Sequence, residues 1–210
     1  MGYDAYHMEK VMTKQDKKII NILLSAGVIA GPLYLTVGLI EAFTRKGFDI
    51  NRHALSVLSN GDLGWIHISD LMVSGALVIC AALGMRRVLS GRGKTWAPIL
   101  VGVYGLGLIL SGIFKADPAL GFPPGTPANA MTISTSGMLH FMTGGIGFFG
   151  LIAACFVFAR RFMQLKQKGW AIYSIVTGIA FLSAFIGIAS GSGNSWTILG
   201  FWIGIILDWI

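Results

Sequence analysis

Charged residues are scarce in this sequence. Asp, Glu, Lys and Arg together make up 12% of the 210 residues, about half of the roughly 25% found in soluble domains. This shortage excludes an ordinary cytosolic globular enzyme, because such a chain needs more charge on its surface. The two cysteines exclude a disulfide framework, and the 29 glycines follow no Gly-x-y period, which excludes collagen.

Hydrophobic residues make up 54% of the chain, and the mean hydropathy is +0.72, which excludes a disordered protein. Six apolar stretches approach the length of about 20 residues that a membrane-spanning helix needs. We therefore predict an all-α polytopic membrane protein, with a cytoplasmic segment over 1–18 and a single transmembrane domain over 19–210. The sixth stretch has about 15 residues, or roughly 22 Å, which is short of a hydrocarbon core of roughly 30 Å. The six predicted helices cover 20–43, 64–85, 96–114, 137–159, 170–190 and 196–210.

The basic residues predict the orientation in the membrane. A net charge of +7 would indicate nucleic-acid binding in a soluble chain. Here, however, twelve of the sixteen Lys and Arg residues lie before residue 19, in 86–94 and in 160–168. Arg45, Lys46, Arg52 and Lys115 are the four basic residues of the opposite loops.

The positive-inside rule then places both termini in the cytoplasm, and the loops 44–63, 115–136 and 191–195 outside. We expect a multi-pass protein of the cell membrane, with the lipid bilayer as its surroundings and no nucleic-acid partner.

Two helix pairs share short sequence features. Gly64-Trp65-Ile66-His67 opens one predicted helix and Gly137-Met138-Leu139-His140 opens another. Both helices end in an arginine pair, at 86–87 and at 160–161, and the next helices begin at Trp96 and Trp170. These features indicate either a parallel repeat of the second and third helices in the fourth and fifth or chance similarity of membrane-helix ends, and both interpretations stay open.

Nearly all ionisable side chains inside the predicted helices lie toward their outer ends. Because such groups are costly inside a bilayer, they are candidates for function. We predict a polar pocket that opens to the outside and binds or moves a small amphiphile or a lipid, with Arg52 suited to an anionic group. The residues predicted to line it are Glu41, Arg52, His67, Asp70, Asp117 and His140.

Four of these residues also form a candidate metal set. His67 and Asp70 are three residues apart on one helical face, and together with Asp117 and His140 they have ligand types that suit a zinc-like ion. His67 and His140 could instead hold haem b axially. The alternative, which we favour, is that no cofactor is bound and the histidines lie at the level of the lipid headgroups.

Motifs in the outer loops resemble those of a known family. The first is Arg52-x-x-x-Ser56-x-Leu58-Ser59 followed by Gly61-x-x-Gly64-Trp65, the second is Gly112-Ile113-Phe114 with Asp117-Pro118, and the third is Gly137-x-Leu139-His140. They are similar to the prokaryotic six-helix membrane family catalogued as domain of unknown function 998, and the similarity covers the first five helices. The resemblance implies a bundle of six helices without an established activity. It singles out Arg52, Ser56, Ser59, Asp117 and His140, so the ligand-binding candidates are these five and Glu41.

Two other functions remain as alternatives. A membrane-embedded hydrolase would use a metal-bound or His140-activated water on a lipid ester, although the sequence has no HExxH or G-x-S-x-G element. An accessory subunit, or a homo-oligomer, would pack through the glycine-rich faces of 96–114 and 137–159, because small residues let membrane helices approach closely.

Overall fold

The computed structural model describes residues 13–130, 133–190 and 195–209, and this part of the chain folds into six α-helices and one short 3₁₀ helix. The predicted all-helical bundle is confirmed. Residues 1–12 of the expected cytoplasmic segment and 191–194 of the expected third outer loop lie outside the described residues. The elements are α2 (Lys14–Thr44), η1 (Leu55–Ser59), α3 (Gly64–Val88), α4 (Trp96–Ile113), α5 (Thr135–Gln164), α6 (Lys168–Ala189) and α7 (Ser195–Trp209).

Helix α2 begins before the apolar stretch that predicted it. Thr13 caps the helix by accepting a hydrogen bond from the Asp16 amide, and the Asp16 carboxylate accepts one in return from the Thr13 amide. This capping box satisfies two amides that an open helix start would leave unpaired. The polar first turn is therefore helical although it carries no apolar signal.

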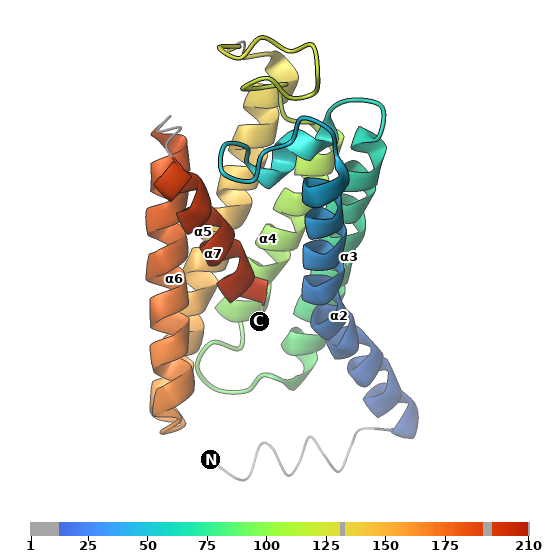
Figure 1. Cartoon of the computed structure of the whole chain (residues 1–210). Coiled ribbons are helices and arrows are strands. Elements are labelled where there is room, and N and C mark those ends of the chain that lie inside the picture. The colour runs from blue at the N-terminus through green and yellow to red at the C-terminus, as the bar shows by residue number, and fades with distance from the viewer. Residues whose placement is uncertain (1–12, 131–132, 191–194, 210) are drawn as a thin grey trace.

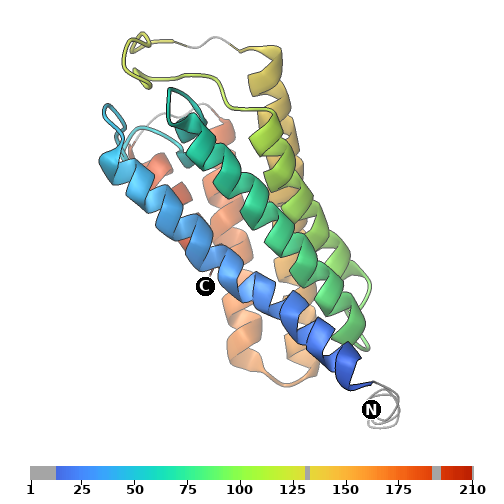
Figure 2. The ribbon, with the colours of Figure 1, turned by 90° about the vertical axis from the view of Figure 1, so that its right-hand side faces the viewer.

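Consecutive helices pack against each other from α2 to α6, and α7 returns to contact both α6 and α2. Figures 1 and 2 show the resulting bundle, in which α7 ends about halfway along α6. The 15 described residues of α7 span roughly 22 Å at 1.5 Å per residue. This helix buries Ile198, Phe201, Trp202 and Ile205 inside the bundle.

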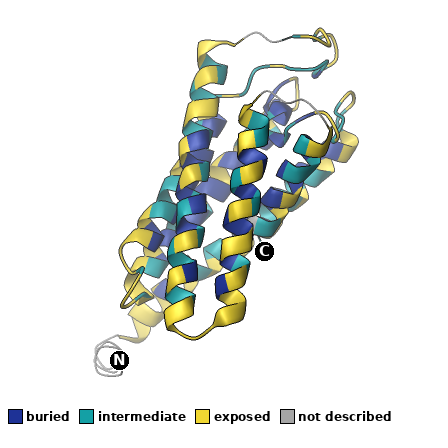
Figure 3. Cartoon of the chain, turned by 90° about the vertical axis from the view of Figure 1, so that its left-hand side faces the viewer, coloured by how far each residue is buried: buried dark blue, intermediate teal, exposed yellow. Residues whose placement is uncertain are grey.

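Helices α2 to α6 are each long and apolar enough to cross a membrane. Figure 3 shows exposed residues along their outward faces and buried residues toward the bundle axis. Large apolar side chains such as Val28 and Phe43 are 77% and 76% exposed on α2. An apolar outer surface of this kind is solvated by lipid and not by water, so the chain is a multi-pass membrane protein.

The two ends of the bundle differ in charge. The loops 45–63 and 114–130 lie at one end, whereas the start of α2 and the basic loops 89–95 and 165–167 lie at the other (Figures 1 and 2). Successive loops therefore lie at opposite ends of the bundle, as the predicted topology requires. That the basic end faces the cytoplasm stays a prediction, based on the positive-inside rule.

Glycines allow α3, α4 and α5 to approach closely. A Cβ atom added to Gly75 on α3 would lie 2.5 Å from the carbonyl oxygen of Gly105 on α4. One added to Gly107 on α4 would lie 2.7 Å from the Cα of Gly147 on α5. No side chain fits at such distances, so these glycines are interface residues within the chain.

The long loops 45–63 and 114–130, which are predicted to face outside and are called the outer loops below, are bonded to each other and form one cover over this end of the bundle. The His53 imidazole lies 3.1 Å from the Leu120 carbonyl through its Nε2 atom, and the Asn60 amide donates a 3.0 Å hydrogen bond to the Ala116 carbonyl. Phe122 of the second loop is only 1% exposed. The described part of this long loop is therefore anchored to the first loop.

Candidate functional site

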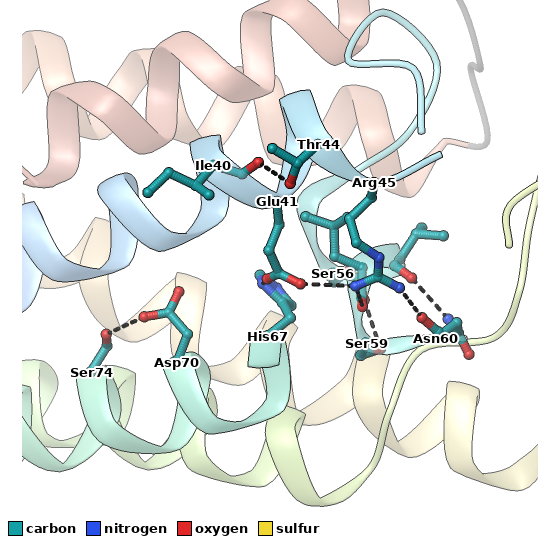
Figure 4. A network of polar contacts seen from close by, with 12 residues as sticks. Ile40, Glu41, Thr44, Arg45, Ser56, Ser59, Asn60, His67, Asp70 and Ser74 are labelled. Atoms are coloured by element: carbon teal, nitrogen blue, oxygen red, sulfur yellow. Dashed lines mark hydrogen bonds and ion pairs between the residues drawn. The ribbon is translucent and has the colours of Figure 1, made fainter. Parts of the chain in front are cut away.

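A buried polar cluster lies where the outer ends of α2 and α3 meet (Figure 4). Glu41 on α2 is 3% exposed and His67 on α3 is fully buried. The Glu41 Oε1 atom accepts a hydrogen bond of 2.8 Å from Arg45, and its Oε2 atom lies 3.3 Å from Nδ1 of His67. The second contact is within ion-pair distance but does not have hydrogen-bond geometry. Glu41 therefore has a cation on one carboxylate oxygen and an imidazole beside the other.

Arg45 connects this cluster to the cover. Besides Glu41, its guanidinium donates hydrogen bonds to the carbonyl oxygens of Leu58, at 3.2 Å, and Asn60, at 2.6 Å. It also lies over the ring of Phe122, 5.3 Å from the centroid, at a distance where a cation–π attraction acts. Since Leu58 belongs to η1 and Asn60 follows it, one side chain holds the end of α2, the first loop and the second loop together.

Asp70 and Ser74 extend the cluster along α3. Ser74 donates a 3.3 Å hydrogen bond to Oδ1 of Asp70. Oδ2 of Asp70 and both ring nitrogens of His67 are buried and have no hydrogen-bond partner among the described residues. Buried polar atoms nearly always have a hydrogen-bond partner in folded proteins. These three atoms can therefore form hydrogen bonds with water or a small polar ligand, or bind a proton.

A cavity of about 90 Å³ lies beside this cluster, within the outer half of the bundle. One water molecule needs roughly 10–15 Å³ of such cavity volume. Tyr34 separates the two sites: it lines the cavity, and its ring centroid lies 6.2 Å from that of His67. The walls are mainly apolar and come from all six described α-helices and the first outer loop: Tyr34, Ala54, Leu55, Ser56, Leu71, Tyr104, Gly107, Leu108, Ser111, His140, Phe141, Gly144, Gly145, Gly147, Phe148, Phe185, Ile188, Phe201 and Ile205.

His140 is the principal polar residue of the cavity. Its Nδ1 atom lies 2.9 Å from the carbonyl oxygen of Ser111 and 2.8 Å from that of Phe114. Carbonyl oxygens only accept hydrogen bonds, so Nδ1 carries the proton. In the neutral ring, Nε2 is then an acceptor, and it has no hydrogen-bond partner among the residues described. His140 is therefore oriented by the end of α4 and keeps one nitrogen available.

The other predicted ligand-binding residues occupy different places. Arg52 is exposed in the first loop. Ser59 is buried and donates its hydroxyl to the Ser56 carbonyl at 2.7 Å. Asp117 accepts hydrogen bonds from the amide and hydroxyl of Ser134, the N-cap residue of α5, at 2.8 and 2.6 Å. Of the six candidates, only Ser56 and His140 line the cavity.

The predicted metal set is not assembled. In the described part of the chain, no group of three or more His, Cys, Asp and Glu side chains is placed to hold a metal ion. His67 lies against Glu41, His140 faces the cavity, and Asp117 is bonded to Ser134, the N-cap residue of α5. Likewise His67 does not line the cavity that His140 lines, so the pair predicted to bind haem b does not share one slot.

Arg45 is the residue that sequence reasoning missed. It was counted among the basic residues of the outer loops, yet its side chain is 8% exposed. A signal was present: Glu41 and Arg45 are four residues apart, a spacing that pairs opposite charges on a helix. Tyr34 was also missed, because an aromatic residue inside an apolar helix gives no sign of the cavity beside it.

The helical bundle, with its apolar outer surface, identifies this chain as a multi-pass α-helical membrane protein. Within that class, the chain belongs to the family described as Protein of unknown function (DUF998), whose model matches residues 28–209. The resemblance seen in the outer-loop motifs is thereby confirmed. No curated protein and no solved structure matches the chain.

Proposed function

We propose that this membrane protein binds a single-chain amphiphile, with the acyl chain in the cavity and the polar group beside His140. The observation that carries the proposal is the composition of the cavity wall. Side chains such as Leu108, Phe148 and Phe201 supply a continuous apolar lining, whereas His140, Ser111 and Ser56 supply a few polar groups. A mainly apolar pocket with few, well-placed polar groups is typical of small-molecule sites.

The apolar lining favours a hydrocarbon chain over water. Apolar cavities of comparable size stay dry and take up apolar ligands. Each methylene group transferred from water into such a site contributes about 0.8 kcal/mol. The gain is smaller for a ligand that leaves the bilayer, since its chain is already in an apolar medium, and selectivity must then come from the polar end.

The polar end suits a group that can donate or share a proton. The free Nε2 atom of His140 can accept a hydrogen bond from a hydroxyl or a protonated carboxyl group, and a protonated imidazole can pair with a carboxylate. The Ser111 hydroxyl faces the same space, since a Cβ added to the cavity-lining Gly144 would lie 3.1 Å from it. Fatty acids and fatty alcohols are the smallest ligands with this chemistry.

The test uses a dodecanoic acid that carries a photoreactive diazirine, with the protein in phosphatidylcholine nanodiscs. Illumination at equilibrium should label cavity residues such as Tyr34, and excess dodecanoic acid should prevent this labelling. Leu108→Trp fills the cavity and should reduce Tyr34 labelling about tenfold or more. The matched control is Leu106→Trp on the same helix, because Leu106 is 49% exposed whereas Leu108 is 5% exposed.

His140→Ala separates a binding role from a structural one. We expect it to weaken probe retention more than it lowers the melting temperature. Unchanged retention together with a large fall in melting temperature would show that His140 is structural. Equal labelling in the Leu108→Trp and Leu106→Trp variants would overturn the proposed function.

A further inference from the structure

We infer that the cavity has a lateral entrance for acyl chains between the outer halves of α5 and α6, closed by the rings of Phe141 and Phe185. This inference rests on the proposed function and adds the route by which the ligand arrives. It commits the ligand to come from the bilayer and not from the water outside.

Two hollows meet at this place. The inner one is the cavity, and the outer one lies on the lipid-facing surface of α5 and α6. The outer hollow is lined by Phe141, Met142, Gly145, Ile146, Phe149, Phe185, Ile186, Ala189 and Ser190. Phe141, Gly145 and Phe185 line both hollows, so within the described part of the chain these three residues form the wall that the hollows share.

The shared wall consists of two rings and a glycine. The rings of Phe141 and Phe185 are stacked, with centroids 6.1 Å apart and an interplanar angle of 25°. Gly145 contributes no side chain, and a Cβ atom added to it would lie 3.3 Å from the tip of the Phe185 ring. Phe185 is buried whereas Phe141 is 48% exposed, so the wall opens by rotation of the Phe141 side chain, and rotamer changes of exposed side chains are fast.

The outer hollow faces hydrocarbon. Its helices α5 and α6 are both apolar enough to span the membrane, and its rim residues Met142, Ile146 and Ile186 are 53%, 61% and 57% exposed. In a bilayer such a surface is covered by acyl chains. An acyl chain is therefore the group that already occupies the outer hollow, and it continues into the cavity once the Phe141 ring turns away.

The route from the water is covered by the described outer loops. Leu55 of η1 lines the cavity and is 2% exposed. Above it, Arg45 and Asn60 tie the first loop to α2 and to the second loop. Opening this cover would break several buried hydrogen bonds, whereas turning the Phe141 ring away from the lateral entrance breaks its stacking on the Phe185 ring.

The experiment follows the rate at which the diazirine-bearing dodecanoic acid reaches the cavity. Nanodiscs that contain the protein are mixed with the probe and illuminated after increasing times, and labelling of Leu108 is quantified by fragment-ion mass spectrometry. Leu106 lies two residues away and faces the lipid, so its labelling measures arrival of the probe in the bilayer.

Phe141→Ala should raise the rate of Leu108 labelling about threefold to tenfold, because it removes one ring of a stacked pair. The matched control is Phe149→Ala. Phe149 is also on α5, is similarly exposed, at 54% against 48%, and also contacts the Phe185 ring, but it lines the outer hollow only. Phe149→Ala should leave the rate unchanged. Phe141→Trp restores an aromatic cover and should return the rate to that of the original protein.

The outcomes separate the two proposals. If Leu108 is labelled but Phe141→Ala and Phe149→Ala behave alike, the lateral entrance is overturned and the amphiphile cavity stands. If His53→Ala, which loosens the outer cover, accelerates labelling more than Phe141→Ala does, the entrance lies at the cover and the inference is also wrong. If Leu106 is labelled and Leu108 is not in any variant, the proposed function itself fails.

Discussion

Replacing Arg45 by methionine tests the buried charge cluster at the outer end of α2. Methionine keeps much of the apolar stem but removes the guanidinium, which contacts Glu41 at 2.8 Å and two carbonyl oxygens at 3.2 and 2.6 Å. Glu41, which is 3% exposed, would keep only the imidazole of His67 beside it. Removing one partner of a buried ion pair costs about 3–5 kcal/mol. We expect the free energy of unfolding of Arg45→Met to fall by this amount.

The matched control is Arg52→Met, seven residues further along the same loop region, where the side chain is exposed. An exposed substitution of this kind should change stability by no more than about 0.5 kcal/mol. The measurement is unfolding by sodium dodecyl sulfate in mixed micelles, followed by far-ultraviolet circular dichroism.

A double-mutant cycle with Glu41→Gln isolates the ion pair. In the double variant no charge of the pair remains buried alone, so its cost should be less than the sum of the two single costs by about 1–3 kcal/mol. Arg45 does not stabilise the buried cluster through its charge if Arg45→Met is as stable as Arg52→Met, or if the two single costs simply add.

Three further predictions concern packing, the cover and the topology. Gly107→Ala places a methyl group against the α5 backbone and should lower the free energy of unfolding by about 1–3 kcal/mol. Gly102→Ala should be neutral or stabilising, because its Cβ would meet its nearest neighbour at 3.8 Å. Equal melting temperatures of the two variants would contradict the close contact at Gly107. His53→Ala removes the hydrogen bond to the second outer loop and should make residues 115–130 more sensitive to protease, and an unchanged cleavage rate would show that other contacts hold this loop. A membrane-impermeant maleimide added to intact cells should label Lys115→Cys but not Lys94→Cys, and the opposite pattern would reverse the predicted orientation.

The helices were largely predictable because lipid imposes one rule on every spanning segment. A backbone in hydrocarbon must satisfy its own hydrogen bonds, so an apolar stretch of sufficient length is a helix. The apolar pattern did not predict helix ends that have another cause. Helix α2 starts at Lys14 because Thr13 caps it, and α5 runs from Thr135 to Gln164 although the apolar stretch predicted only 137–159.

The candidate site was less predictable, since it depends on contacts between distant parts of the chain. Asp117 was expected in the pocket, but it accepts hydrogen bonds from Ser134, the N-cap residue of α5 seventeen residues later. Arg45 was counted only as a basic residue of the predicted outer loops, but its side chain is 8% exposed and donates hydrogen bonds to carbonyl groups of the residues around η1. The hydropathy and charge of a residue do not show which distant backbone group will form hydrogen bonds with its side chain.

The amino-acid sequence by itself determined that this is a polytopic helical membrane protein, with Glu41, His67, Asp70 and His140 toward one end of the bundle, because hydropathy and charge act on each segment separately. Only the tertiary structure decided which of those residues share a site. It places Glu41 between Arg45 and His67 and orients the His140 side chain toward an apolar cavity. Arg52, in contrast, is exposed in the first loop and belongs to neither site. The physical reason is that short-range contacts depend on how helices from different parts of the chain pack, and in this protein glycine contacts and the returning helix α7 set that packing.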